Sequence, residues 1–211
     1  MADAKERILG RIRQALQRQD PQPYEGEDLS GPVFTASSDP LDVLFAERFT
    51  QAGGKFFFAE SPVHLIQALR ELFAAKGWTS VACRDEALRR EFTQAGLPSL
   101  YDGLDLEAAQ AGLSRCESLV ARTGSILLSS RLASGRALPI YPPVQLVVAD
   151  TAQLVPDIAD GLTAIRKRDG QQLPSLINLA TGPSRTADIE KTLVLGAHGP
   201  REVYVFLLDR P

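Results

Sequence analysis

The stretch KFFFAESPVHLIQALRELFAAKGWTSVACRD, residues 55–85, indicates the fold class. It opens with a short apolar run, Lys55–Ala59, which has the length and composition of a buried strand. Ser61 and Pro62 then form a typical helix start, because serine can cap free backbone amides and proline is preshaped for the first helical turn. The following residues carry an apolar stripe at helical spacing, formed by Leu65, Leu69, Leu72 and Phe73. With a second apolar run in TSVACRD, the stretch predicts a strand–helix–strand unit, which is typical of parallel α/β sheets.

The same alternation continues on both sides of this unit. Helices are expected at Pro40–Ala52 with Asp39 as N-cap, at Glu86–Gln94, at Leu106–Ala111, at Pro156–Lys167, and between Pro183 and Gly196. Strands are expected in LPSLYD at 97–102, VQLVVAD at 144–150, SLINLATG at 175–182 and EVYVFLLD at 202–209. Together these elements predict a layered α/β fold built on an open mixed sheet.

The stretch CESLVARTGSILLSS, residues 116–130, breaks the alternation. It contains two short apolar runs, at 119–121 and 126–128, which are separated by RTGS. Two such runs joined by a turn that contains glycine are typical of a hairpin. We therefore expect an antiparallel element that joins the sheet at this point.

The composition excludes several classes of protein. The 211 residues are 44% hydrophobic and 23% charged, which is ordinary for a globular chain. The formal net charge of -3 provides no general attraction for nucleic acid or for an anionic membrane. No apolar run approaches the roughly 20 residues that a membrane span needs, and the first 19 residues lack the apolar core of a secretory signal. A cytoplasmic protein is expected, without a membrane span and without a nucleic-acid partner.

The two cysteines, Cys83 and Cys116, lie far apart and have no cysteine or histidine neighbour at ligand spacing. That spacing argues against a zinc site, an iron–sulfur cluster and a redox-active cysteine pair, so no metal is expected. Both are interpreted as buried small apolar residues in a reducing compartment.

The first 32 residues differ from the rest of the chain. Residues 1–19 predict an amphipathic helix with apolar positions Ile8, Leu9, Ile12 and Leu16. Residues 20–32 are rich in proline, glycine and acids, which is typical of a linker. Residues 33–211 are predicted to form a single α/β domain, and the helical arm packs either on that domain or on a partner.

A candidate binding site lies in TGPSRTADIEKTLVLGAHGPR, residues 181–201. If Pro183 starts a helix after Gly182, the amides of Ser184, Arg185 and Thr186 lie at its N-terminus, with two hydroxyls and a guanidinium beside them. Such a terminus binds anions, and phosphate or a carboxylate is the expected ligand. Asp188 in the same turn complements the helix dipole, whereas Arg185 opposes it. Arg185 therefore pairs with an anionic ligand or with an acid of the protein itself.

Two further features surround this site. His198 could act as a catalytic acid or base, or it could cap the preceding helix. Three arginines, Arg122, Arg131 and Arg136, bracket a serine-rich loop, and with Arg185 and Arg201 they could form a cationic cleft or could be ordinary exposed arginines. No nucleotide-binding or metal-binding signature is present, so the sequence indicates no cofactor.

Three segments carry a resemblance to a known family. ARTGSILLSS, PPVQLVVAD and GPSRTADIEKTLVLGAHGPREVYVFLLD resemble the LUD-domain proteins of the LutC/YkgG family of lactate utilisation proteins. The resemblance covers residues 116–209. It implies a fold like that of the NagB/RpiA/CoA-transferase group, and a bacterial cytoplasmic protein that acts in the oxidation of L-lactate to pyruvate beside iron–sulfur partner subunits.

Two positions depart from the family pattern. Arg122 precedes Thr123 and Gly124 where the family usually has glutamate, and Gln145 stands where histidine is frequent. A covalent mechanism that depends on that glutamate is therefore not expected. With the acid replaced by a cation, Thr123, Gly124 and Ser125 are candidate residues for binding an anion or a substrate. The replacement could equally mark a paralogue with a different function.

The sequence supports two main candidate functions. The first is a non-redox subunit of lactate oxidation that binds a small carboxylate or contributes structure, since the chain has no cysteine cluster of its own. The second is an independent enzyme acting on a phosphorylated or CoA-linked metabolite, as the implied fold group suggests. A purely structural adaptor, with the N-terminal helix as its main feature, is a third reading.

Overall fold

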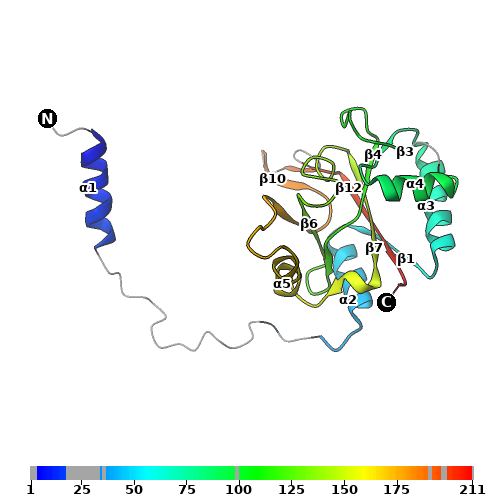
Figure 1. Cartoon of the computed structure of the whole chain (residues 1–211), viewed down its shortest axis with the longest axis horizontal. Coiled ribbons are helices and arrows are strands. Elements are labelled where there is room, and N and C mark those ends of the chain that lie inside the picture. The colour runs from blue at the N-terminus through cyan, green and yellow to red at the C-terminus, as the bar shows by residue number, and fades with distance from the viewer. Residues whose placement is uncertain are drawn as a thin grey trace. The chain divides into compact units, whose positions relative to one another are not determined.

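A computed structural model describes residues 4–17, 34, 37–97, 100–189, 192–195 and 199–210 (Figure 1). The chain divides into two units, Met1–Ser37 and Ser38–Pro211. The first unit holds α1 (Ala4–Leu16), the amphipathic helix expected from the sequence, and its apolar positions are exposed. The residues interpreted as a linker fall outside the described part, so that interpretation stays a prediction. Among the described helices, none is both long enough and apolar enough to cross a membrane.

Six parallel strands form the central sheet of the second unit, in the order β1-β12-β7-β4-β2-β3. Their bounds are β1 Lys55–Ala59, β2 Val81–Ala82, β3 Leu100–Tyr101, β4 Ala111–Ser114, β7 Val144–Asp150 and β12 Glu202–Leu208. The two longest, β7 and β12, pair along their whole length. Both are buried almost throughout, as expected for a parallel sheet that is covered on both faces. The expected parallel α/β sheet is confirmed.

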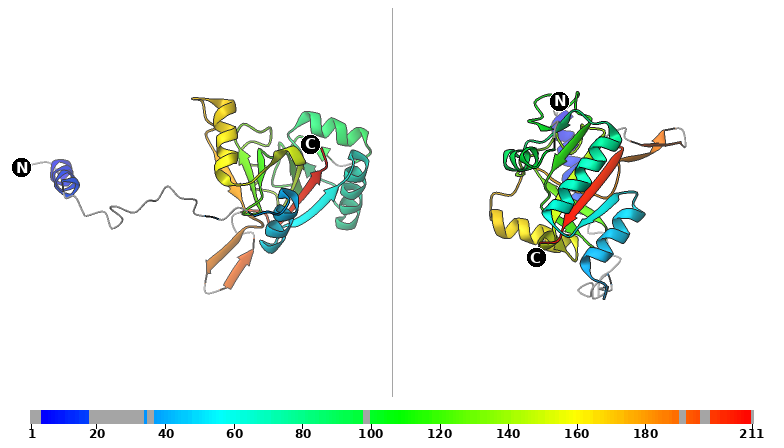
Figure 2. Two further views of the ribbon diagram at one scale, coloured as in Figure 1. Left: turned by 90° about the horizontal axis from the view of Figure 1, so that it is seen from below. Right: turned by 90° about the vertical axis from the view of Figure 1, so that its right-hand side faces the viewer.

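Helices α3 (Pro62–Lys76) and α4 (Glu86–Gln94) cover one face of this sheet (Figure 2). Ser61 caps α3 as predicted, because its Oγ accepts a hydrogen bond from the backbone amide of His64 at 3.2 Å. Asp85 caps α4 in the same way. The helices and the sheet bury one core, which includes Leu65, Leu69, Phe73, Leu88, Phe92, Leu113, Leu146 and Phe206.

Helix α2 (Leu41–Gln51) and a second sheet cover the opposite face. This small sheet has the strand order β8-β5-β6-β9, with β5 Ser118–Val120, β6 Ser125–Ser129, β8 Leu154–Val155 and β9 Ile177–Ala180. A short 3-10 helix, η1 (Thr151–Gln153), precedes β8. A second core joins α2 to both sheets through Phe45, Phe49, Leu119, Ile126, Leu128, Val147, Val205 and Leu207.

Helix α5 (Ile158–Asp169) packs on the far side of the small sheet (Figure 2). Gly161 allows this approach, because a Cβ added there would lie 2.9 Å from a methyl carbon of Leu127. The layers of the domain are therefore α3 with α4, the central sheet, α2 with the small sheet, and α5.

The expected helix between residues 183 and 196 is wrong. Its described part is an antiparallel hairpin of β10 (Arg185–Ile189) and β11 (Thr192–Leu195), which projects from the body of the domain (Figure 2). The amide of Ser184, which a helix start would leave free, donates a hydrogen bond to the carbonyl of Pro200 at 2.9 Å. β-branched side chains also favour strands here, namely Thr186, Ile189, Thr192 and Val194.

Three smaller expectations also need correction. No helix forms at 106–111, because the Asp105 carboxylate accepts hydrogen bonds from the amides of Glu107 and Ala108 and so holds a turn. The N-cap position of helix α2 is occupied by Pro40, one residue later than the predicted Asp39. The hairpin of residues 116–130 is confirmed, but it pairs with β9 in the small sheet and does not join the central one.

Glu202 links β12 to β1 and to the end of α3. Its carboxylate accepts hydrogen bonds from Lys55 Nζ at 2.5 Å, from Lys76 Nζ at 2.9 Å and from the Tyr204 hydroxyl at 2.7 Å. Burial alone would raise the pKa of Glu202, but these three donors lower it to about 2. The charged carboxylate therefore stabilises the folded chain.

Glu202→Gln should lower the free energy of unfolding at neutral pH and lose that effect in acid. The folded-state pKa lies below the ordinary value of 4.5, so the stabilisation is fully present above pH 4.5 and disappears as the pH falls towards 2. Urea unfolding of both proteins at several pH values measures the difference. Glu86→Gln, which removes an exposed ion pair with Arg90, should change stability little at any pH. A difference for Glu202→Gln that stays constant down to pH 2 would contradict the assignment.

The C-terminal end of α2 lies directly against two glycines of the small sheet. Gly124, in the β5–β6 turn, has φ +62°, and a Cβ there would lie 2.3 Å from the backbone nitrogen of Phe49. Gly182, which follows β9, has φ +73°, and a Cβ there would lie 2.4 Å from the carbonyl oxygen of Ala52. Any side chain at either position would push the helix away from the small sheet.

Gly124→Ala should reduce the free energy of unfolding by about 3 kcal/mol, because it adds a backbone clash to the cost of a positive φ. Gly77→Ala is the matched control. Gly77 has φ +64° with nothing within 4 Å of an added Cβ, so that change should cost only about 1 kcal/mol. Urea unfolding of the two variants gives both values, and equal losses would show that the contact with α2 is unimportant.

Candidate functional site

A cavity of about 430 Å³ lies between the central sheet and the small sheet. The central sheet supplies Gln145 and Val147 from β7 and Val203 from β12. The small sheet supplies the opposite wall with Ile126, Leu128 and residues 178–180. Residues 139–140, 181–185 and 199–200 complete the lining. Since Gln145 and Val203 are the second residues of their strands and pair in register, the cavity lies at the amino-terminal ends of β7 and β12.

Backbone hydrogen bonds hold the segment with Gly182 and Pro183 close to the segment with Gly199 and Pro200. Besides the bond from Ser184 to Pro200, the amide of Arg201 donates to the carbonyl of Pro143 at 2.8 Å. Gly199 permits the close approach, because a Cβ there would lie 3.1 Å from the Cβ of Ser184. The turn after β9 and the turn before β12 therefore form one wall of the cavity.

Gln145 is the buried polar group of the cavity, with 3% of its surface exposed. Its Nε2 donates a hydrogen bond to Ser114 Oγ at 2.8 Å on the neighbouring strand β4. No described residue donates a hydrogen bond to its Oε1. An acceptor left unpaired in the interior costs about 1–3 kcal/mol, so this oxygen favours a ligand or water that brings a donor.

Arg185 carries the charge of the cavity. It is exposed, and it is the only charged side chain among the described residues of the lining. Its guanidinium donates a hydrogen bond to the Ala52 carbonyl at 2.6 Å, at the negative end of the α2 dipole. Among the side chains that the structure describes, no carboxylate forms an ion pair with it. The lining of the cavity thus includes an exposed cation, Arg185, and a buried amide residue, Gln145.

The other polar lining residues are Asn178, Thr181 and Ser184. Their neutral hydrogen-bonding groups lie among apolar side chains, which is typical of a pocket for a small organic ligand. The sequence analysis did not select Asn178 or Thr181. Strand alternation in 177–180 could have indicated that Asn178 and Ala180 share one face of β9.

Three of the predicted binding residues, Gly182, Ser184 and Arg185, line the cavity. The amide of Ser184 is already bonded, and β10 begins at Arg185, so the helix N-terminus expected here does not exist. Thr186 and Asp188 lie on β10, but their side chains are outside the described part of the chain. His198 is also outside the described residues, so its catalytic role stays a prediction.

The turn Thr123–Ser125 does not line the cavity, but it contacts Thr181, which does. Ser125 is fully buried, and its Oγ lies 2.7 Å from the hydroxyl oxygens of both Thr123 and Thr181. Gly124 is pressed against α2, as described above. The turn therefore positions Thr181, and direct contact with a ligand stays a prediction for these three residues.

The structure does not bring the five arginines of the predicted cleft to one point. Arg122 forms a bidentate pair with Asp157, with both N–O distances 2.8 Å. Arg131 donates a hydrogen bond to the carbonyl of Gln172 and Arg136 to that of Ser175. Of the five arginines, only Arg185 is among the described residues that line the cavity. Arg122 thus binds an acid of the protein itself.

The remaining candidate groups have structural roles. His64 is exposed on α3, with its ring centre 5.0 Å from that of Phe57. Both cysteines are buried, as predicted. Burial raises the pKa of Cys83 to about 11 and raises that of Cys116 further, so both thiols stay protonated. Within the described ranges, no group of three or more histidine, cysteine or acidic side chains is placed to hold a metal.

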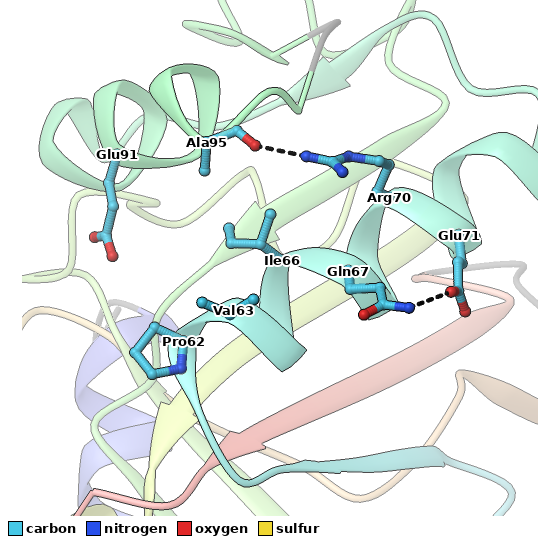
Figure 3. Close-up of a pocket in the computed structure, with 8 residues that line it drawn as sticks. All are labelled: Pro62, Val63, Ile66, Gln67, Arg70, Glu71, Glu91 and Ala95. Carbon is cyan, nitrogen blue, oxygen red and sulfur yellow. Dashed lines mark hydrogen bonds between the residues drawn. The ribbon is translucent and has the colours of Figure 1, made fainter.

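A larger hollow of about 640 Å³ lies between α3 and α4 (Figure 3). Its polar side chains already have partners: Arg70 donates to the Ala95 carbonyl at 2.8 Å and Gln67 donates to Glu71 at 3.0 Å. Pro62, Val63 and Ile66, from the first turns of α3, supply apolar lining. Because this groove lacks an unpaired buried polar group, the smaller cavity beside Gln145 is the better candidate for a functional site.

Comparisons with known proteins agree with this fold. A crystal structure of a DUF162 family protein from Deinococcus radiodurans is similar to it, with a TM-score of 0.53 and 21% sequence identity, over 80% of this chain and 96% of that one. At this identity the likeness concerns the fold alone. The mixed α/β class expected from the sequence is confirmed.

Several relatives are named lactate utilization protein C. The one from Geobacillus kaustophilus is 35% identical over 84% of this chain and 72% of its own length. The one from Shouchella clausii is 30% identical over 82% of this chain and 81% of its own length. The match to the Bacillus licheniformis protein, at 35% identity, spans 45% of that protein.

A family model for the LUD domain matches residues 103–208, about half of the chain. This range contains β4 to β12 and every described residue that lines the cavity. It also contains the three segments on which the resemblance rested, apart from Asp209 at the end of the last one, and that resemblance is confirmed. The chain belongs to the LUD-domain family.

Proposed function

We propose that this chain is a non-redox subunit of bacterial L-lactate utilisation that binds a small carboxylate, such as lactate or pyruvate, in the cavity between its sheets. The names of the relatives support the process. The observation that carries the proposal for the ligand is one cavity lined both by Gln145, whose buried amide oxygen has no described donor, and by Arg185, whose guanidinium has no described acid partner.

A three-carbon 2-hydroxy acid matches this lining group by group. Its carboxylate suits the Arg185 guanidinium and the hydroxyls of Thr181 and Ser184, because charge-assisted hydrogen bonds are the strong ones. Its hydroxyl group can donate to Gln145 Oε1, the acceptor that lacks a partner. Its methyl group suits the apolar side chains of the walls, such as Ile126 and Val203.

Electron transfer in such a process belongs to other subunits. The two cysteines are buried and protonated, so they provide neither an iron–sulfur ligand set nor a redox thiol. At the turn where the sequence resemblance leads us to expect glutamate, this chain has Arg122, which is paired with Asp157. A covalent transfer mechanism at that turn is therefore disfavoured, and binding alongside iron–sulfur partner subunits fits the residues better.

L-lactate or pyruvate should raise the melting temperature of the full chain in a concentration-dependent way, as mass action requires of a ligand that binds the native state. Arg185→Ala should lower the affinity for the ligand by about 10- to 100-fold, which is the usual effect of losing a charge-assisted hydrogen bond. Arg131→Ala is the matched control, because Arg131 also donates to a backbone carbonyl but does not line the cavity. A full response in Arg185→Ala would exclude the site.

Gln145→Leu provides a second, independent test. It removes the unpaired oxygen as well as the hydrogen bond to Ser114, so stability should change by less than about 1 kcal/mol. The response to lactate should nevertheless fall, because the acceptor for the hydroxyl group is gone. Stabilisation by phosphate or CoA, without any by lactate or pyruvate, would favour an independent enzyme that acts on a phosphorylated or CoA-linked metabolite.

The place of the chain in lactate oxidation can be tested in cells that grow on L-lactate. Tagged full-length protein should co-purify with iron–sulfur subunits, and deletion of its gene should reduce lactate oxidation. Arg185→Ala should restore the interaction but not the full rate, because its change lies in the cavity. Normal lactate oxidation in the deletion strain would refute the proposed process, whatever the thermal measurements show.

A further inference from the structure

Strand β1 lies at one edge of the central sheet. Its residues are Lys55, Phe56, Phe57, Phe58 and Ala59, and they pair only with β12 among the described strands. An apolar edge strand is a template for pairing with another chain, and natural proteins usually protect such edges with charges, proline or a bulge. Three consecutive phenylalanines in this place therefore require an explanation.

The backbone directions of β1 follow from its pairing. The amide of Asp209 donates to the carbonyl of Ala59, so the backbone groups of Ala59 face β12. In a parallel ladder the residues alternate, so those of Phe57 and Lys55 also face β12, and those of Phe56 and Phe58 face outward. No described residue forms a hydrogen bond with the backbone of Phe56 or Phe58 at this edge.

The side chains of β1 leave apolar surface at the same edge. Phe57 packs towards α3, whereas Phe56 packs towards α2. Phe58 is 36% exposed. A cavity of about 380 Å³ lies beside the strand on the α3 side, where Ala68, Leu72 and Ala75 leave room next to Phe57.

We propose that β1 pairs antiparallel with β1 of a second copy of this chain, so that the two central sheets join across a two-fold axis. The outward-facing residues must meet each other, and of the registers that allow this we propose the one with Phe56 opposite Phe58 of the second copy and Phe57 opposite Phe57. All three phenylalanines then form cross-strand aromatic pairs, each of which adds to the stability of the pairing.

Charge favours a second copy over an unrelated strand. The sequence KFFFAE begins with a cation and ends with an anion, so antiparallel pairing with itself brings Lys55 beside the end of the other strand that carries Glu60. Parallel pairing would place like charges together. The cavity beside Phe57 can receive apolar side chains from the second copy, and the small residues of α3 allow the two helices to approach.

The full chain should form a dimer of twice 22.9 kDa in sedimentation equilibrium or light scattering over a concentration series. Phe58→Pro removes an outward amide, which an edge strand tolerates, and should weaken dimerisation by about tenfold or more. Phe58→Lys should also weaken dimerisation, because it adds like charges to the joined edge. Leu104→Lys, at an exposed apolar residue away from β1, is the matched control and should leave the dimer unchanged.

A disulfide test fixes the register. Phe57→Cys should form a covalent dimer on mild oxidation, because residue 57 lies opposite itself at a close non-hydrogen-bonded position. Phe58→Cys should not, because the two copies of residue 58 are about 7–8 Å apart on the diagonal, beyond disulfide reach. The native cysteines are buried and do not interfere.

A chain that stays monomeric throughout the series would overturn the proposal. So would a dimer of unchanged strength in both Phe58→Pro and Phe58→Lys, because its interface would then lie elsewhere. Cross-linking through position 58 in place of 57 would exclude the register. Circular dichroism of each variant must match that of the unaltered chain, and Phe58→Lys keeps the test decisive if Phe58→Pro does not fold.

Discussion

The contact between the end of α2 and the glycines of the small sheet holds the two halves of the domain at a fixed separation. Gly124 and Gly182 approach the helix backbone so closely that neither could carry a side chain. Phe45 and Phe49, on the same helix, enter the core that both sheets share. Because packed interiors do not deform continuously, this seating of α2 fixes the gap between the sheets, and the gap is where the candidate site lies.

The cavity is lined by one group that is unfavourable in a protein core. The amide oxygen of Gln145 is buried without a described donor, and this reduces stability in the free protein. Arg185, by contrast, is exposed and is held by the carbonyl of Ala52, so its charge carries no comparable cost. Polar groups kept at a cost to stability are typical of binding sites, where a ligand supplies the missing partners.

Local signals made much of the fold predictable from the sequence. The bounds of α4 and the start of α3 were predicted from capping residues and apolar spacing, which are signals that act over one or two helical turns. Strand β1 was predicted from its composition. The segment after Gly182 was predicted wrongly because Pro183 resembles a helix start, whereas a hydrogen bond from Ser184 to the distant Pro200 selects another path. Local rules cannot anticipate a partner that lies sixteen residues away.

The candidate site was predictable only in part, for the same reason. Gly182, Ser184 and Arg185 were found because they are close in sequence, although the helix assumed for them does not form. Gln145 was singled out in the sequence only because the resemblance led us to expect histidine there. That it lines one cavity with Asn178 depends on the packing of two sheets. The arginines were grouped by charge, but four of them, Arg122, Arg131, Arg136 and Arg185, are instead held by separate carbonyls or carboxylates.

One short segment connects the cavity with the edge of the central sheet. Arg185 is anchored to the carbonyl of Ala52, and β1 begins three residues later, after Gly53 and Gly54. Gly54 lies against the ring of Phe49, so the path from α2 to β1 has little freedom. Pairing that fixes the position of β1 therefore also fixes the carbonyl of Ala52, which positions Arg185. If a ligand orders this junction, joining of the edges and occupation of the cavity favour each other by the same free energy, because coupling between two binding events is reciprocal.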